Sequence, residues 1–327
     1  MKTNVAIIGA GMMGRIHARA WSELPGVHIS AVVDCDRTAA DALAQRYRAL
    51  STTSLTEGLA DAMIVSICTP PHVHAEHVEA AARIGADILL EKPAATTVSD
   101  YERMQEAIDR SGVRLMVGMT GRFYPECRRA FAALNDGTIG RPIAYAEHMH
   151  FDASELPDWY FQRPYAGGGV LLTNGIHSFD RVLWLLQPQN VRILAATVRS
   201  LGHRGDVEDF ADIVLDCDGI ICRVQLLWQP GADAIRTVEL VGERGTLYVE
   251  MYRGITITNA DGQQSERPYR EQADFLERTL VGVRGEVQAL LEARTAGIPA
   301  PSSLDENRRA FDLIMDIYRY AQGGADD

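Results

Sequence analysis

A glycine-rich turn follows the first apolar run of the chain. Gly9, Gly11 and Gly14 form the pattern G-x-G-x-x-G directly after the run Asn4–Ile8. In such a turn the first glycine permits a tight bend, the second lets the main chain approach a pyrophosphate, and the third lets a helix pack closely on a strand. The start of that helix also offers unpaired N–H groups and the positive end of its dipole to an anion. The pattern predicts a dinucleotide-binding turn, and the expected contacts are Gly9, Gly11, Met12, Met13 and Gly14.

An acidic side chain at the end of the next apolar run supports that interpretation. Asp34 closes the run Ile29–Asp34 and stands 20 residues after Gly14, where a carboxylate can hold the ribose hydroxyls of NAD. A carboxylate repels the additional phosphate of NADP, so we expect NAD to be preferred. Arg37 lies three residues later and partly offsets that repulsion, which keeps NADP as an alternative. Asp34 and Arg37 are both expected cofactor contacts.

A lysine stands at the end of a further apolar run. Lys92 follows Asp87–Leu90 within the sequence Glu91-Lys92-Pro93. Open α/β sheets bind ligands beyond the carboxyl ends of their strands, so this position suits an active-site group. Taken alone, it fits a solvated surface lysine before a turn proline equally well.

A polar stripe lies far along the chain, in the apolar segment Val170–Leu186. Thr173, His177 and Asp180 recur at i, i+4 and i+7, so they share one face of the helix expected there. The stripe fits a cleft that faces a cofactor. It also fits a core histidine whose hydrogen bonds are satisfied.

The segments around the glycine turn, Asp34 and Lys92 alternate between strand and helix patterns. This alternation predicts a parallel sheet with right-handed crossovers and helices on both faces. The expected strands are Asn4–Ile8, Ile29–Asp34, Ala62–Cys68, Asp87–Leu90 and Arg114–Gly118, and the expected helices are Met12–Leu24, Thr38–Arg48, His74–Ile84 and Ser99–Arg110.

The pattern changes after about residue 140. Apolar runs joined by short turns predict hairpin-linked strands, at Ile143–Phe151, Val191–Arg199, Phe210–Asp216, Ile220–Trp228, Thr237–Val241, Thr246–Glu250 and Ile255–Thr258. Ser303 with Glu306 forms a capping box that predicts a tail helix over about 303–322. We therefore expect an α/β Rossmann domain with a doubly wound parallel sheet at residues 1–120. An α+β domain with an open, mostly antiparallel sheet is expected at 121–327, its tail helix able to pack back toward the first domain.

Composition excludes several classes of protein. The chain has 327 residues, is 46% apolar and carries a net charge of −12, which argues against disorder and against binding to nucleic acid or anionic membranes. No apolar run approaches the ~20 residues of a membrane helix, and the first apolar run is too short for a secretory signal. Five scattered cysteines without a Cys-x-x-Cys pair indicate free thiols, so we expect a cytoplasmic protein. No cluster has metal-ligand spacing, and no metal is expected.

Taken in order, the motifs of essentially the whole chain resemble those of the Gfo/Idh/MocA oxidoreductases, the relatives of glucose–fructose oxidoreductase and inositol dehydrogenase. The motifs that carry the resemblance are Gly9–Gly14 with His17, Thr69-Pro70-Pro71 with His74, Glu91-Lys92-Pro93, Gly167–Asp180, Val207-Glu208-Asp209 and Val241–Thr246. The resemblance implies a Rossmann domain, a C-terminal sheet that forms homodimers or homotetramers, and a small carbohydrate or polyol as substrate. It adds Thr69, Pro70, His74, Glu91 and Lys92 to the expected cofactor contacts.

The resemblance also implies that Lys92 is the catalytic lysine and that His177 lies near the reacting carbon. The implied reaction interconverts a hydroxyl and a ketone, with hydride passing to or from nicotinamide C4 and the hydroxyl proton passing to Lys92. A free lysine titrates near ~10.4, and burial together with the positive nicotinamide ring lowers that value. The chain departs from the family pattern at Thr173, where relatives carry Asp, and at Thr120-Gly121, where many carry Asn-Arg. Since Thr173 cannot stabilise a protonated His177, we expect His177 mainly to orient the substrate hydroxyl.

Aromatic, basic and polar side chains around these motifs suit a polyhydroxylated ring. The expected substrate contacts are Arg122, Tyr124, His148, Trp159, Arg163, Thr173, Asn174 and His177. Two other functions stay open from the sequence alone. One is an enzyme that retains NAD while it cleaves a glycosidic bond or recycles the hydride internally. The other is a non-catalytic regulator that binds a dinucleotide, against which Lys92 and His177 argue because a pure binder needs neither.

Overall fold

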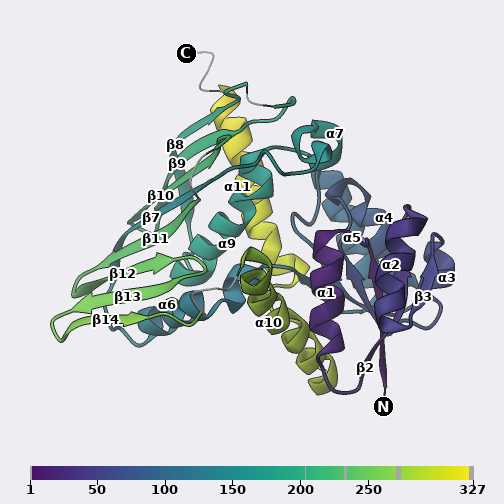
Figure 1. Cartoon of the computed structure of the whole chain (residues 1–327). Helices are drawn as coiled ribbons and strands as arrows, with labels where there is room; N and C mark the ends of the chain where they lie inside the picture. Colours follow the sequence, from purple (N-terminus) through teal and green to yellow (C-terminus); the bar gives the residue numbers. More distant parts are fainter. Residues whose placement is uncertain (1, 203, 232–233, 270–273, 324–327) are drawn as a thin grey trace. The chain divides into compact units, whose positions relative to one another are not determined.

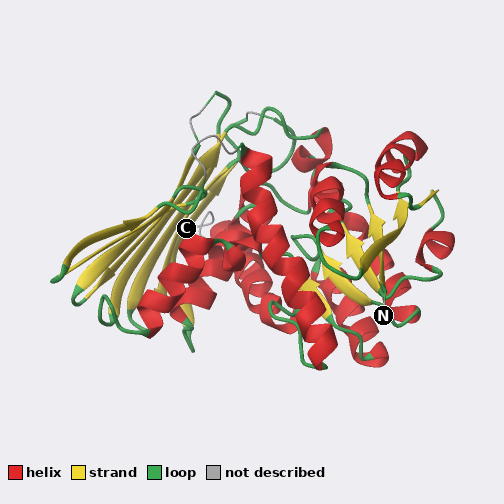
Figure 2. Cartoon of the chain, turned by 60° about the horizontal axis from the view of Figure 1, so that its bottom comes forward, coloured by secondary structure: helices red, strands yellow, loops and turns green. Residues whose placement is uncertain are grey.

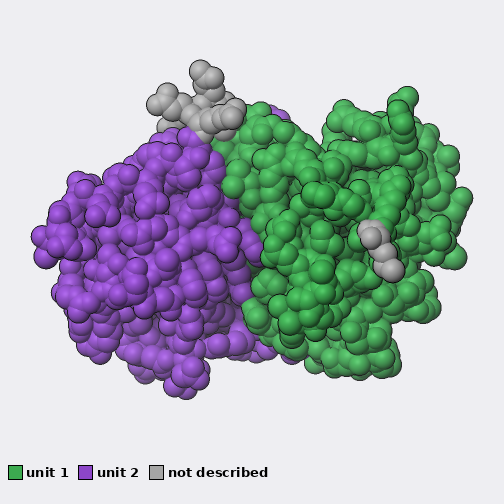
Figure 3. All heavy atoms as spheres, turned by 90° about the horizontal axis from the view of Figure 1, so that it is seen from below, with its two compact units in different colours: residues 1–120, 274–307 green, residues 121–273, 308–327 purple. Residues whose placement is uncertain are grey.

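The computed structural model describes residues 2–202, 204–231, 234–269 and 274–323. It divides into two compact units, shown in different colours in Figure 3. Unit 1 comprises Met1–Thr120 and Asp274–Asn307, and unit 2 comprises Gly121–Ala273 and Arg308–Asp327. Each unit has its own sheet and is described by itself.

Unit 1 is built on a six-stranded parallel sheet in the order β3-β2-β1-β4-β5-β6. The strand order reverses between β1 and β4, which is the switch point where doubly wound sheets bind ligands. The predicted Rossmann topology is confirmed. The elements of this sheet and its crossovers are β1 (Thr3–Ile8), α1 (Met12–Ser22), β2 (Val27–Val33), α2 (Arg37–Tyr47), β3 (Leu50–Thr52), α3 (Leu55–Leu59), β4 (Ile64–Ile67), the 3₁₀ turn η1 (Pro71–Val73), α4 (His74–Arg83), β5 (Asp87–Leu90), α5 (Val98–Ser111) and β6 (Leu115–Val117).

Local sequence explains where these elements begin and end. The central strands β4 and β5 are buried along their whole length, as expected for strands that are covered on both faces. Asp36 caps α2 by accepting hydrogen bonds from the N–H groups of Thr38 and Ala39. Gly112 ends α5 in the left-handed conformation, which glycine adopts without steric cost. These signals lie close to their elements, and for this reason the sequence located most of unit 1.

A long helix from the C-terminal half of the sequence completes unit 1. Helix α10 (Phe275–Ala296) packs beside α1 (Figure 1) and buries the apolar side chains of Leu280, Val283, Val287 and Leu290. Residues 274–307 therefore lie in unit 1, although the sequence analysis placed them in the second domain. These residues belong to unit 1 because α1 covers the apolar face of α10.

Unit 2 is built on an eight-stranded sheet in the order β14-β13-β12-β11-β7-β10-β9-β8. Among the described strand pairs of this sheet, β7 with β10 is parallel and the others are antiparallel, which confirms the expected open, mostly antiparallel sheet. Its strands are β7 (Pro142–Phe151), β8 (Val191–Arg199), β9 (Phe210–Cys217), β10 (Ile220–Trp228), β11 (Ile235–Gly242), β12 (Gly245–Glu250), β13 (Gly254–Asn259) and β14 (Gly262–Glu266).

Helices cover one face of this sheet (Figures 1 and 2). The helical segments that begin in or belong to unit 2 are α6 (Pro125–Asn135), η3 (Asp158–Phe161), α7 (Arg163–Ala166), α8 (Val170–Thr173) and α9 (Gly175–Leu186), and η2 (Thr120–Phe123) leads into them. The tail helix α11 (Leu304–Gly323) begins in unit 1 and continues in unit 2 from Arg308 onward. The Ser303 hydroxyl caps α11 by accepting the N–H of Glu306 at 3.2 Å, as the capping box predicts.

The helix that carries the polar stripe differs from its prediction. The apolar spacing predicts one helix over Val170–Leu186, but the chain breaks at Asn174, between α8 and α9. The Asn174 side-chain oxygen accepts a hydrogen bond from the Trp228 indole N–H at 2.8 Å. Gly175 follows directly, and a glycine inside a helix favours such an interruption.

Candidate functional site

The glycine turn between β1 and α1 has the geometry of a dinucleotide cradle. Gly9 has φ +95°, and a Cβ atom on Gly14 would lie 1.8 Å from the main-chain oxygen of Gly9, so both positions require glycine. A Cβ on Gly11 would meet no protein atom within 4 Å, so open space adjoins this residue. Helix α1 has no side-chain cap at its start, and its first N–H groups can therefore bind an anion. These features fit the pyrophosphate of NAD, with Met12 and Met13 in the first turn.

Asp34 follows β2 and is bonded to the same turn. Its Oδ2 accepts the N–H of Ala10 at 2.6 Å and its Oδ1 accepts the N–H of Asp36 at 2.9 Å. Each oxygen of an ionised carboxylate can accept further bonds, so the ribose hydroxyls of NAD fit here. Arg37 is largely exposed and its Nε donates to Asp41 at 3.0 Å.

The loop after β4 is fastened by two histidines. His74 is fully buried, and its ring nitrogens lie 3.1 Å from the carbonyl oxygen of Ala94 and 2.9 Å from that of Thr69. The Thr69 hydroxyl lies 3.1 Å from Nδ1 of His77, and burial lowers the pKa of His77 to about 4. Thr69 and Pro70 are half-buried and remain suited to a cofactor contact. His74 reaches no solvent, so this residue holds two loops together instead of facing a ligand.

Lys92 is half-buried directly after β5, and its main-chain N–H donates to Glu91 Oε2 at 3.1 Å. The other carboxylate oxygen of Glu91 lies 2.9 Å from Nε2 of His17, whose Nδ1 lies 2.8 Å from the Ser66 hydroxyl. Burial opposes both charges, but the hydrogen bond with His17 holds the pKa of the Glu91 carboxyl below its usual range. Cys68 and Glu91 raise the pKa of His17 well above its usual range, although burial acts in the other direction. A buried ion pair therefore fixes the main chain at Lys92.

In unit 2 the polar stripe is distributed over the break between α8 and α9. Thr173 is buried, whereas Asn174 and His177 are half-buried. Because the Asn174 oxygen accepts from Trp228, the amide NH₂ is the part of this side chain left for a substrate oxygen. Asp180 is buried and forms a bidentate ion pair with Arg122, at 2.9 Å from Nε and 2.7 Å from a terminal nitrogen. Asp180 is therefore neutralised by a fixed partner.

Several expected substrate contacts have other roles in unit 2. The Arg122 guanidinium is committed to Asp180. Tyr124 is buried, and its ring packs edge-on against Tyr252 with centroids 5.0 Å apart. The Arg163 main-chain N–H donates to Asp206 at 2.8 Å, and its exposed guanidinium lies within 3.4 Å of the carbonyl oxygens of Gly167 and Asp206.

His148 does not fit the predicted substrate contact. Its neighbour Glu147 accepts hydrogen bonds from Ser178 and Arg181 of α9, so Glu147 faces the helix that carries His177. Successive side chains of a strand point to opposite faces, and His148 therefore lies on the other face, with its ring 5.8 Å from that of His150. Trp159 is half-buried and stacks on Tyr160 at 3.8 Å, which is the arrangement of a packed loop anchor.

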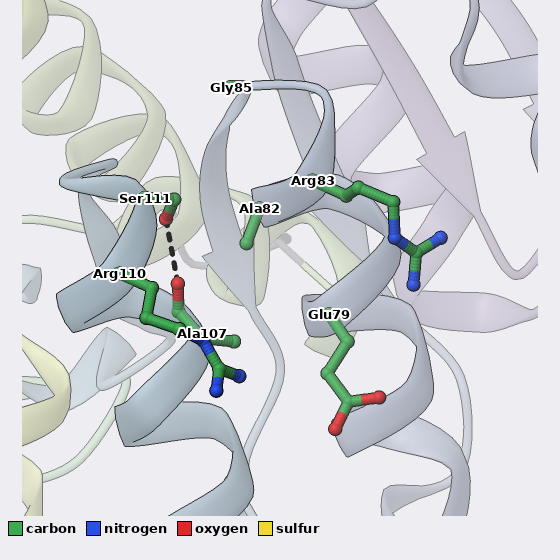
Figure 4. Close-up of a pocket in the computed structure, with 7 residues that line it drawn as sticks. All are labelled: Glu79, Ala82, Arg83, Gly85, Ala107, Arg110 and Ser111. Carbon is green, nitrogen blue, oxygen red and sulfur yellow. Dashed lines mark hydrogen bonds between the residues drawn. The ribbon is translucent and has the colours of Figure 1, made fainter.

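Unit 1 also has a surface hollow that is separate from the glycine turn and Lys92. It lies between α4 and α5 (Figure 4), and it is lined by Glu79, Ala82, Arg83, Gly85, Ala107, Arg110 and Ser111. Helix α4 ends at Arg83 just before β5 begins, so the hollow lies toward the amino ends of the strands. The glycine turn and Lys92 lie at the carboxyl ends, where α/β sheets bind ligands. We do not assign the hollow to the cofactor.

Glu208 and Glu286 are buried acids that were not identified from the sequence as functional candidates. Glu208 bonds to the start of α8, and Glu286 lies on α10 close to Glu91. Glu208 was visible only as part of the Val207-Glu208-Asp209 motif, and nothing in the local sequence of Glu286 distinguishes it from an exposed helical acid. Within the described residues, no group of three histidine, cysteine, aspartate or glutamate side chains has the arrangement of a metal site. No described helix is long and apolar enough to span a membrane.

Comparison with known proteins agrees with this architecture. Residues 3–119 match the model of an oxidoreductase family with an NAD-binding Rossmann fold, and residues 127–248 match the GFO/IDH/MocA C-terminal domain. The chain is 29% identical over 311 residues to inositol 2-dehydrogenase of Rhizobium meliloti, covering 93% of each chain. It is 30% identical to inositol 2-dehydrogenase 2 of Saccharopolyspora erythraea, covering 91% of this chain and 86% of that protein. The solved structure of GenD2 from gentamicin A biosynthesis in complex with NAD is 26% identical, with a TM-score of 0.86, and covers 99% of this chain and 95% of that chain.

The Rossmann sheet and the family match thus define an NAD-binding oxidoreductase. The chain belongs to the Gfo/Idh/MocA family. This confirms the resemblance drawn from the ordered motifs.

Proposed function

We propose that this protein is an NAD-dependent dehydrogenase that oxidises a hydroxyl of a cyclic polyol or sugar to a ketone, and that Lys92 is its acid/base. The observation that carries the proposal is the position of Lys92. It follows β5 at the same edge of the sheet as the glycine turn and Asp34, and the His17–Glu91 pair fixes its main chain. The substrate class is supported by the two inositol 2-dehydrogenases, which are similar over more than nine-tenths of this chain.

The residues of unit 1 bind the cofactor and move the proton. Bound NAD supplies the two-electron acceptor for the oxidised carbon. The main chain at Gly11 and the first N–H groups of α1 hold the pyrophosphate, and Asp34 holds the adenosine ribose and favours NAD over NADP. Lys92 Nζ accepts the proton of the substrate hydroxyl and returns it in the reverse direction.

The residues of unit 2 recognise the substrate. His177 orients the reacting hydroxyl through a ring nitrogen, and the Asn174 NH₂ group donates to a neighbouring oxygen. Thr173 supplies a neutral hydroxyl where relatives carry a carboxylate.

We also propose that the open face of the unit 2 sheet joins copies of the chain into a homodimer or homotetramer. Ile221, Ile235 and Tyr248 lie on the face opposite the helices and are 45%, 45% and 42% exposed. Exposed apolar side chains on a sheet face that no helix of the unit covers favour contact with another copy. Light scattering at micromolar concentration tests this proposal, and a monomer would contradict it.

The test of the activity is NADH formation followed by absorbance. NAD and NADP are supplied separately, with cyclitols, sugars and sugar acids as substrates. The proposal expects NAD-dependent oxidation of at least one cyclitol or sugar, with a higher kcat/KM for NAD than for NADP. No reduction of either cofactor by any of these compounds, while the protein binds NAD, would refute it.

A further inference from the structure

The start of α8 depends on one residue that lies far away in the sequence. Glu208 precedes β9 and is 4% exposed. Its Oε1 accepts the N–H groups of Gly169 at 2.8 Å and Leu171 at 3.1 Å, and its main-chain oxygen accepts the N–H of Val170 at 2.9 Å. The first N–H groups of a helix have no partner within the helix. Glu208 therefore satisfies three consecutive N–H groups where α8 begins.

Two further contacts fix Glu208 itself. The Tyr318 hydroxyl of α11 donates to the same Oε1 at 2.6 Å. A Cβ atom on Gly169 would lie 1.8 Å from the Glu208 main-chain oxygen, so the approach of the two segments requires glycine. Oε2 of Glu208 lies 3.6 Å from the Arg163 guanidinium and accepts no hydrogen bond among the described residues. All the hydrogen bonds of this carboxylate are therefore made by the oxygen that caps α8.

The capped turn is connected to His177 by a short series of main-chain bonds. The Thr173 N–H donates to the main-chain oxygen of Gly169 at 2.9 Å, and the Asn174 N–H donates to that of Val170 at 3.0 Å. The His177 N–H donates to the main-chain oxygen of Asn174 at 3.0 Å. Helix α8 has four residues, which is too short for a helix to persist without tertiary contacts. The position of Thr173 and the first turn of α9 thus depends on how α8 is capped.

We propose that Glu208 is a positioning residue for His177 and acts through α8. The inference rests on the proposed function, in which His177 orients the substrate hydroxyl. Burial raises the pKa of Glu208, but the hydrogen bonds from Tyr318 and Gly169 act against this. A carboxylate suits the role because it makes stronger hydrogen bonds to N–H groups than a neutral acceptor does, and because negative charge is favoured at a helix start. Glu208 touches neither the substrate nor the cofactor, so its replacement acts on the substrate side of the reaction.

The kinetic test compares four variants of the full chain with the wild type. Glu208→Ala removes the acceptor, Glu208→Gln keeps an uncharged one, and Glu208→Asp keeps the charge but retracts it by one methylene. Tyr318→Phe removes one donor and leaves the cap in place. We expect Glu208→Ala to lower kcat/KM for the polyol by ~10²-fold, the effect of a displaced positioning group. The Kd for NAD, measured by calorimetry, should change less than about twofold, because every residue assigned to NAD lies in unit 1.

Rescue separates positioning from a general loss of structure. Glu208→Gln should recover at least ~10-fold of the loss in Glu208→Ala, because its amide oxygen can still accept the two N–H groups. Tyr318→Phe should stay within about threefold of the wild type, since both N–H bonds remain. Equal rates in Glu208→Ala and the wild type, or no rescue by Gln, would overturn the proposal. If Glu208→Ala does not fold, Glu208→Asp takes its place in the same comparison.

A second readout keeps this inference distinguishable from the proposed function. The imidazole NMR signals of His177, assigned by their loss in His177→Gln, are compared between wild type and variants without any substrate. We expect them to shift in Glu208→Ala or Glu208→Asp and to stay unchanged in Tyr318→Phe. Unchanged signals in the Glu208 variants would overturn the positioning role, even if the wild type oxidises polyols. If no polyol is oxidised, the proposed function fails, but this measurement still decides whether Glu208 positions His177.

Discussion

Glu286 provides the sharpest prediction about unit 1. This residue of α10 is fully buried, and neither carboxyl oxygen has a hydrogen-bond partner among the described residues. A Cβ atom added to Gly118 would lie 3.7 Å from Oε1 of Glu286 and 3.7 Å from Oε1 of Glu91. The two carboxyl groups therefore lie close together. Burial and the nearby charge of Glu91 raise the pKa of Glu286 well above its usual range, although the His17 charge acts against this. Burial beside the His17–Glu91 pair therefore favours the protonated form of Glu286.

The replacement Glu286→Gln removes this titration and changes how stability depends on pH. A carboxyl with a raised native pKa contributes stability that is fully present below its unfolded pKa, near ~4.3, and is lost as the pH rises toward its native pKa. Within that window the native state holds one proton more than the unfolded state. The free energy of unfolding then falls by about 1.4 kcal/mol per pH unit from this residue alone. Glu286→Gln should therefore become progressively more stable relative to the wild type as the pH rises above the unfolded pKa of ~4.3.

Urea denaturation at several pH values measures this difference. Trp21 suits the assay because its indole N–H lies 3.3 Å from Ser66, next to the His17–Glu91 pair. The slope against pH is compared instead of the stability at one pH, because a buried amide adds a constant cost. Glu286→Leu is the matched control and should show the same slope as Gln with a different offset. Parallel pH curves for the wild type and Glu286→Gln would refute the reasoning.

Four other substitutions test the cofactor cradle and the second unit. Asp34→Ala should raise the KM for NAD about tenfold, the effect of losing a hydrogen-bonded carboxylate, and should shift the ratio of kcat/KM toward NADP; an unchanged ratio would contradict the assigned role. Gly11→Ala should keep the wild-type Tm, because its Cβ meets no protein atom, but should lose affinity for NAD in calorimetry. Gly14→Ala should lower the Tm as well, because its Cβ would lie 1.8 Å from a main-chain oxygen. Arg122→Ala should lower the free energy of unfolding by about 3–5 kcal/mol, because it leaves Asp180 buried and uncompensated; a loss below about 1 kcal/mol in urea denaturation would contradict the buried pair.

The sequence located the features that depend on local pattern. The glycine turn, Asp34 at the end of β2 and Lys92 after β5 each follow an apolar run, and a parallel sheet brings the ends of its strands to one edge. The alternation of strands and helices therefore predicted both the Rossmann topology and the place of the cofactor residues. The hairpins of unit 2 were recognised from local pattern as well, because their apolar runs are joined by short turns.

Features that depend on tertiary contacts were not predicted. Arg122 and Tyr124 follow β6 as the sequence suggested, but both contact partners that are distant in the chain, Asp180 and Tyr252. His148 was assigned to the substrate because strand alternation does not state which face is covered, and only the bonds of Glu147 to α9 decide this. Helix α10 has apolar residues at helical spacing, yet its place in unit 1 comes from packing against α1.

The proton-transfer role of Lys92 is the central claim, and single-turnover reduction of NAD tests it most directly. Wild type, Lys92→Ala and Lys92→Arg are mixed with saturating NAD and the best polyol substrate, and NADH is followed by stopped-flow absorbance. We expect Lys92→Ala to be slower by ~10²–10⁴-fold and to bind NAD with unchanged affinity. Lys92→Arg should be similarly slow, because a guanidinium keeps the charge but cannot accept the proton. Wild-type rates in either variant would contradict the account.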